Sequence, residues 1–214
     1  MNKDHSPMVA QWPVRIVILG LFLTILIGAA SLPFLYPSTS LWYKFGLDKT
    51  FLQSGKVVGL LAATLLLNQL LLGSRPKLLT TFFSAKILLK AHQISGFLIT
   101  ALAVIHPLLI LASEQFTLLT IEKKNWPEGL GALLFLTIVT TVLMATWRVR
   151  LGLSYPRWRL LHHSGALILP SLLGVHVLNV SDTYATGVPR LTVIAALFLY
   201  GLTWGWVQVL RHRQ

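Results

Sequence analysis

The amino-acid sequence predicts an all-α integral membrane protein with six transmembrane helices, and three observations carry that prediction. The 214 residues are 55% hydrophobic and 11% charged, whereas soluble domains carry about 25% charged residues. Six apolar segments follow one another along the chain, and a membrane-spanning helix needs about 20 such residues. Four histidines lie inside two of these segments at one repeated spacing. We therefore expect a single transmembrane domain over residues 1–214.

Hydropathy places the spans between loops that are too short for a second domain. We expect the spans at residues 16–35, 57–72, 87–112, 130–147, 160–180 and 191–209. The first span follows Arg15 and contains the small residues Gly28-Ala29-Ala30-Ser31, so a cleaved signal peptide is an alternative. Its apolar run is nevertheless longer than the usual run of about 7–15 residues. The second core is short and needs Gly55, Lys56 and Gly73 at its ends to cross the bilayer. The third is long and requires a tilt.

The cations sort to one side of the predicted membrane. The amino terminus, the second and fourth loops and the carboxyl terminus carry most of them and a single acid, Asp4. By the positive-inside rule both termini are cytoplasmic, and we expect a bacterial inner membrane. The net charge of +12 therefore indicates topology rather than nucleic-acid binding. The cations on this side are Lys3, Arg15, Arg75, Lys77, Lys86, Lys90, Arg148, Arg150, Arg157, Arg159, Arg211 and Arg213.

The chain contains no cysteine. This excludes disulfides, iron–sulfur clusters, zinc–thiolate sites and covalently attached c-type haem. Any haem must therefore be held without a covalent link, through histidine.

The intramembrane histidines form two pairs, each 14 residues apart: His92 with His106, and His162 with His176. On an α-helix 14 residues advance about 1400°, about 40° short of four turns, and rise about 21 Å. Both members of a pair therefore lie on one helix face, near opposite membrane surfaces. Because the third and fifth spans run in the same direction, His92 and His162 share the cytoplasmic depth. His106 and His176 share the outer one.

Two imidazoles at each of two depths are the axial ligand set of two six-coordinate b haems. The sequence thus predicts two stacked haems between the third and fifth helices, and electron transfer across the membrane. Small residues that follow a histidine by one turn, Gly96 and Gly165 among them, leave room for a flat group. A haem-free metal transporter lined by the same histidines is the alternative. Such a path usually also contains carboxylates, and none lies within a predicted span.

His163 competes with His162 as the ligand. Its spacing of 13 to His176 corresponds to a face about 140° away on a straight helix, which favours His162. Pro170 lies between them and can kink the helix, so the choice stays open. Arg159 precedes His162 by three residues on nearly the same face, and we expect its guanidinium to pair with a haem propionate.

Three segments resemble the ferric-reductase-like transmembrane domain shared by ferric reductases and NADPH oxidases. They are S-G-K-V-V-G-L-L-A-A in the second span, A-H-Q-I-S-G-F with A-V-I-H in the third, and S-Y-P-R-W-R-L-L-H opening the fifth. The resemblance covers about residues 50–180. It implies two b haems and electron flow from a cytoplasmic reductant to an outer acceptor such as ferric iron. In bacterial members a Trp-Arg-x-x-His run ends on the ligand, which implies His162.

The chain also departs from the larger members of that family. It has no G-x-G-x-x-G or comparable nucleotide motif, so we expect an oxidoreductase subunit that takes electrons from a separate flavoprotein reductase or from quinol. Ile110 follows His106 by one turn, where the oxidases have a further histidine, so superoxide production is not expected. The haem subunit of a periplasmic methionine sulfoxide reductase system is another alternative. That branch lacks one of the four histidines, and His92 argues against it.

Overall fold

The structure of the chain is a computed structural model, described here over residues 11–117 and 122–212. It is all-helical, and six helices are long and apolar enough to cross a membrane, as predicted. The long helices are α1 (Trp12–Leu35), α2 (Gly46–Ser74), α4 (Ala85–Ser113), α5 (Trp126–Thr146), α6 (Tyr155–Val180) and α7 (Gly187–His212). The short ones are α3 (Lys77–Phe82) and the 3₁₀ turns η2 (Thr39–Tyr43), η4 (Lys123–Asn125) and η5 (Asp182–Tyr184).

The main difference from the predicted spans concerns α2. This helix begins at Gly46 rather than at residue 57, and it is 29 residues long, so the second span is not short. Hydropathy detects only the apolar part of a helix, whereas the added residues contain no proline to stop it. Asp48 lies in the first turn, where a negative charge stabilises a helix through its dipole.

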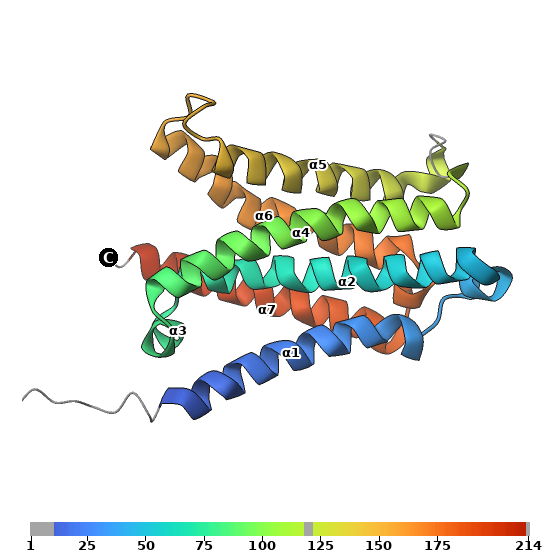
Figure 1. Cartoon of the computed structure of the whole chain (residues 1–214), viewed down its shortest axis with the longest axis horizontal. Helices are drawn as coiled ribbons and strands as arrows, with labels where there is room; N and C mark the ends of the chain where they lie inside the picture. The colour runs from blue at the N-terminus through green and yellow to red at the C-terminus, as the bar shows by residue number, and fades with distance from the viewer. Residues whose placement is uncertain (1–10, 118–121, 213–214) are drawn as a thin grey trace, which may run out of the picture.

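Both ends of the chain lie at one end of the bundle (Figure 1). There α1 begins and α7 ends, beside α3 and the connection between α5 and α6. The connections from α1 to α2, from α4 to α5 and from α6 to α7 lie at the opposite end. Consequently α4 and α6 run in the same direction.

We call the first of these ends the basic end. Within the described residues it carries no acid, whereas Asp48, Glu114, Glu122, Glu128 and Asp182 belong to the opposite end. Of the cations predicted on this side, Lys3 and Arg213 lie outside the described residues, and the side chain of Arg211 is not described. Its described cations are Arg15, Arg75, Lys77, Lys86, Lys90, Arg148, Arg150, Arg157 and Arg159.

The helices pack as two close pairs, α2 with α4 and α5 with α6. The backbones of α4 and α6 make almost no close contact with each other. Between the pairs, a buried apolar layer includes Ile99 of α4 and Leu169 of α6. Each of these residues lies midway along its helix between two histidines. The layer therefore separates two levels of the bundle.

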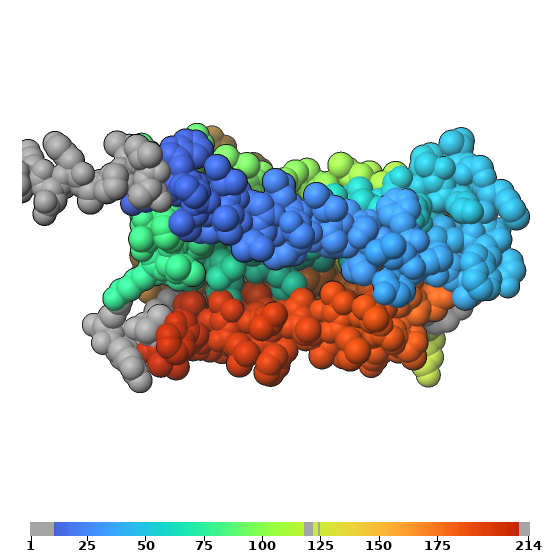
Figure 2. All heavy atoms as spheres, turned by 90° about the horizontal axis from the view of Figure 1, so that it is seen from below, coloured from blue at the N-terminus to red at the C-terminus, as the bar shows by residue number. Residues whose placement is uncertain are grey.

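The outer surface is apolar along α1 and α7. Figure 2 shows these two helices running lengthwise across one face of the bundle, with atoms of α2 visible between them. Large apolar side chains such as Leu19, Ile25 and Phe198 are exposed on them. An apolar surface of this kind suits contact with lipid chains.

Candidate functional site: two facing histidine pairs

The structure brings the four intramembrane histidines together as two pairs. The ring centroids of His92 and His162 lie 5.9 Å apart, with an angle of 75° between the ring planes. Those of His106 and His176 lie 6.4 Å apart, at 80°. In both pairs one ring comes from α4 and the other from α6. The imidazoles thus meet across the gap between two helices whose backbones stay apart.

Backbone carbonyls of the neighbouring helices hold three of these rings. His106 Nδ1 donates to the Gly55 carbonyl and His176 Nδ1 to the Pro127 carbonyl, each at 2.8 Å. His92 Nδ1 makes a longer contact of 3.3 Å with the Gln69 carbonyl. Donation from Nδ1 leaves the lone pair on Nε2, the arrangement typical of a metal-ligating histidine.

Glycines in the same neighbouring helices make room for the rings. A Cβ on Gly59 of α2 would lie 2.8 Å from His106 Cε1, and one on Gly131 of α5 would lie 2.7 Å from His176 Cε1. At Gly73 of α2 the distance to His92 Cε1 would be 3.3 Å. Sequence reasoning missed these three glycines because they lie on helices without a ligand. Only the recurrence of glycine in α2 and α5 hinted at close approach.

The small residues predicted beside the histidines differ in what they contact. A Cβ on Gly96 would lie 3.6 Å from Gln69 Nε2, and one on Gly165 would lie 3.7 Å from Leu169 Cδ1, so both positions have ordinary space. Gly174, two residues before His176, is instead filled by Leu197 of α7, 2.6 Å from such a Cβ. Gly174 therefore serves helix packing.

His162 differs from the other three histidines in its surroundings. Its Nδ1 is buried and has no hydrogen-bond partner among the described residues. The indole of Trp158 stacks on its ring instead, at 5.3 Å between centroids and 20° between planes. Two further buried polar atoms of this region, Trp158 Nε1 and Ser95 Oγ, also have no partner within the described part of the chain.

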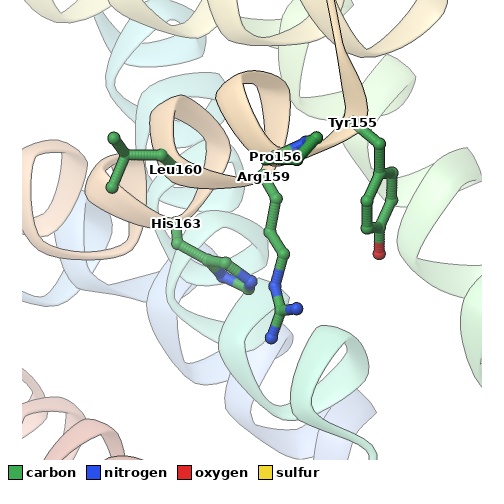
Figure 3. Close-up of a pocket in the computed structure, with 5 residues that line it drawn as sticks. All are labelled: Tyr155, Pro156, Arg159, Leu160 and His163. Atoms are coloured by element: carbon green, nitrogen blue, oxygen red, sulfur yellow. The ribbon is translucent and has the colours of Figure 1, made fainter.

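His163 and Arg159 lie together beside an open pocket. Both project from α6 into an open pocket of about 320 Å³ that is also lined by Tyr155, Pro156 and Leu160 (Figure 3). The His163 ring centroid lies 6.4 Å from that of His162. The structure thus places His162, and not His163, opposite His92.

A carboxylate lies near the opposite-end pair. Glu128 falls within the first turn of α5, as Asp48 does in α2, so the expectation that the spans contain no carboxylate was wrong for both helices. The Oε2 atom of Glu128 is buried and has no hydrogen-bond partner among the described residues. The carboxylate interacts electrostatically with His176. The span prediction missed it because the helix begins at Trp126, before the apolar run.

Lys56 is engaged at the opposite end rather than at the rings. Its Nζ donates a hydrogen bond to Ser38 Oγ, and its positive charge helps to lower the pKa of Asp182. Ile110, which follows His106 by one turn, packs its side chain against Gly55, 2.7 Å from the position of an added Cβ.

Comparison with known proteins agrees with the predicted resemblance. Residues 58–173 match the family described as the ferric reductase like transmembrane component, which is more than half of the chain. This segment contains His92, His106 and His162, and His176 lies just beyond it. An uncharacterized protein of Archaeoglobus fulgidus is 28% identical over 127 residues, which are 55% of this chain and 69% of that protein. No solved structure matches.

Proposed function

The chain belongs to the ferric reductase like transmembrane component family, and from this membership we propose that it transfers electrons across a membrane through two b-type haems. The axial ligands are His92 with His162 at the basic end, and His106 with His176 at the opposite end. The observation that carries the proposal is the facing of these rings across the gap between α4 and α6.

The spacing of the rings fits one metal ion between them. A metal–imidazole bond is about 2 Å long, so two imidazoles on opposite sides of one metal have their centroids about 6 Å apart. The observed separations are 5.9 and 6.4 Å.

The number of ligands distinguishes a haem iron from a bare metal ion. A protein that holds a bare zinc ion commonly uses about four ligands. Here no three His, Cys, Asp or Glu side chains gather into such a group within the described residues. Two ligands are what an iron already held by a porphyrin needs.

The protein's own part in the reaction is to hold the two haems, to orient the imidazoles and to keep the two levels apart. A six-coordinate haem supplies one-electron transfer between the ferric and ferrous states. The carbonyls of Gly55 and Pro127 orient His106 and His176. The apolar layer that includes Ile99 and Leu169 lies between the two levels and keeps water out of the path.

Direction follows from the charge asymmetry of the bundle. With the basic end on the cytoplasmic side, a separate flavoprotein reductase or quinol donates electrons near His92 and His162. An outer acceptor such as ferric iron takes them near His106 and His176. The protein acts as an oxidoreductase subunit of a bacterial inner membrane, and Arg159 offers a cation for an inner-haem propionate.

An absorption spectrum and a haem assay of the purified full chain test the proposal. We expect α and Soret bands that sharpen with dithionite, and two haems per chain. In the variant His106→Ala we expect one haem, because only the opposite-end site loses a ligand. A chain without haem, or two haems retained in His106→Ala, overturns the ligand assignment.

A further inference from the structure

The four proposed ligands are not held in the same way. His92, His106 and His176 each point Nδ1 at a carbonyl of a neighbouring helix. His162 has no such acceptor, and its Nδ1 is buried without a partner. Something else must fix the plane of that ring, because an imidazole without a hydrogen bond can rotate about its Cβ–Cγ bond.

Trp158 lies in the place to do this. It precedes His162 by four residues on α6, so the two side chains lie on one helix face. The rings stack at 5.3 Å and 20°. The Trp158 ring, which is half-buried, has two further neighbours. It lies 5.5 Å from the Tyr155 ring, and the Arg148 guanidinium carbon lies 5.9 Å from its centre. Arg148 also lies 5.7 Å from the Tyr155 ring. A cation over an aromatic face is attracted by the ring quadrupole, which holds the stack together.

We propose that Trp158 is the positioning residue of His162, and that its stacking replaces the backbone hydrogen bond that orients the other three ligands. The inference rests on the proposed function, because it takes His162 as an iron ligand.

This replacement makes the two haem sites unequal. Donation from Nδ1 to a carbonyl raises the basicity of an imidazole ligand, and a more basic ligand stabilises ferric iron. The opposite-end site has two such bonds of 2.8 Å. The basic-end site has only the 3.3 Å contact of His92. The cations of the basic end act in the same direction, because nearby positive charge favours the ferrous state. The basic-end haem therefore has the higher reduction potential and is reduced first.

A redox titration combined with electron paramagnetic resonance (EPR) of the ferric protein tests both parts. Imidazole planes at 75° and 80° leave the iron orbitals nearly degenerate, so each haem should give a strongly anisotropic low-spin signal. His106→Ala, which leaves only the basic-end haem, identifies the signal and potential of that site. We expect this haem to be the one that titrates at the higher potential in the unmodified chain.

The variant Trp158→Leu should change only the basic-end haem. Without the stack the His162 ring turns and its Nδ1 reaches water, so this EPR signal shifts and the higher potential falls. Trp158→Phe keeps an aromatic face and should restore both values towards those of the unmodified chain. Trp206→Leu removes an exposed tryptophan of α7 and should change neither. Unaltered potentials and signals in Trp158→Leu, or changes confined to the other haem, overturn the proposal.

A second pair of variants tests the same proposal if Trp158→Leu does not accumulate as a folded protein. Arg148→Gln removes the cation over the stack, and Arg150→Gln removes an equal charge from the same connection. Only Arg148→Gln should alter the basic-end EPR signal, and equal effects of the two variants overturn the positioning role. A chain with no haem at all would instead contradict the proposed function. Two haems with symmetric, unresponsive potentials contradict only the inference about Trp158.

Discussion

At the scale of residues, the placement of the facing histidines depends on glycines in the neighbouring helices. Gly59 and Gly131 allow α2 and α5 to approach His106 and His176 so closely that a single Cβ would overlap each ring. The same close approach brings the Gly55 and Pro127 carbonyls within 2.8 Å of the imidazoles. The orientation of the His106 and His176 rings is thus a property of the neighbouring helix as much as of their own.

Gly131→Ala should remove the opposite-end haem. The added methyl would lie 2.7 Å from His176 Cε1, and the ring must turn away from its partner to relieve the overlap. The haem content measured by pyridine haemochrome should fall from two per chain to one. Gly129→Ala is the matched control, because a Cβ there meets nothing within 4 Å. Full haem content in Gly131→Ala would contradict the steric argument.

At the scale of elements, hydrogen bonds tie together two connections at the opposite end. Asp182 of η5 accepts from Thr39 N at 2.8 Å and from Thr39 Oγ1 at 2.6 Å. Thr183 Oγ1 donates to the Tyr36 carbonyl at 3.2 Å. The link joins the turn after α1 to the turn after α6. His176 lies only four residues before Val180, where α6 ends. It therefore limits fraying of the part of α6 that carries His176.

Acid should weaken this link. Burial alone would raise the pKa of Asp182, but the hydrogen bonds from Thr39 and the charge of Lys56 outweigh it and hold the pKa below its usual value. A depressed pKa in the folded state stabilises the fold above the unfolded value of about 3.9. That contribution is lost as the pH falls through the lower, folded value.

Thermal unfolding of the detergent-solubilised protein, followed by circular dichroism at a series of pH values, measures the effect. The midpoint temperature should fall on acidification through and below the ordinary aspartate range. Asp182→Asn should be less stable at neutral pH and should lose less on acidification. Parallel curves for the two proteins would show that Asp182 does not contribute.

At the scale of the whole molecule, charge divides the bundle into two unlike ends. Every described acidic residue lies at the end opposite to α3, so the described charged residues of the basic end are all cations. Both Trp12, where α1 begins, and the end of α7 belong to the basic end (Figure 1). The positive-inside rule predicts that this end faces the cytoplasm. In the proposed function, electrons then leave the cytoplasm when they pass from the basic-end pair to the opposite-end pair.

The orientation can be tested with single cysteines, since the chain has none of its own. Ser154, exposed in the connection before α6, and Thr186, exposed before α7, lie at opposite ends of the bundle. In intact spheroplasts a membrane-impermeant maleimide should label Thr186→Cys and leave Ser154→Cys unlabelled. Lysis should make both reactive. The reverse pattern in intact spheroplasts would invert the proposed direction of electron transfer.

Much of the helical architecture could be predicted because hydropathy and helix length are local properties. The ends of the helices could not, as α2 shows, because polar residues from Gly46 onward continue a helix without an apolar signal. Glu128 was placed outside its helix for the same reason. The connection between α2 and α4 contains the short helix α3, which was not among the predicted spans.

The candidate site could be predicted only in part. The depth of each histidine follows from the 14-residue spacing, since α-helix geometry fixes both phase and rise. The competition between His162 and His163 could not be decided in the same way, because Pro170 interrupts the phase argument. Trp158 lies within the segment that opens the fifth span, and nothing in the spacing indicated that its ring stacks on that of His162.

By itself, the sequence determined the number of spans, the absence of thiol chemistry, the sorting of charge and the faces on which the histidines lie. These follow from composition and from the period of a helix, which each segment carries alone. Only the tertiary structure decided which carbonyl and which glycine meet the imidazoles of His92, His106 and His176. It also decided which of two adjacent histidines faces His92. Such contacts depend on how neighbouring helices are rotated and shifted against one another. A change of one residue in that register would replace every partner while leaving the hydropathy pattern the same.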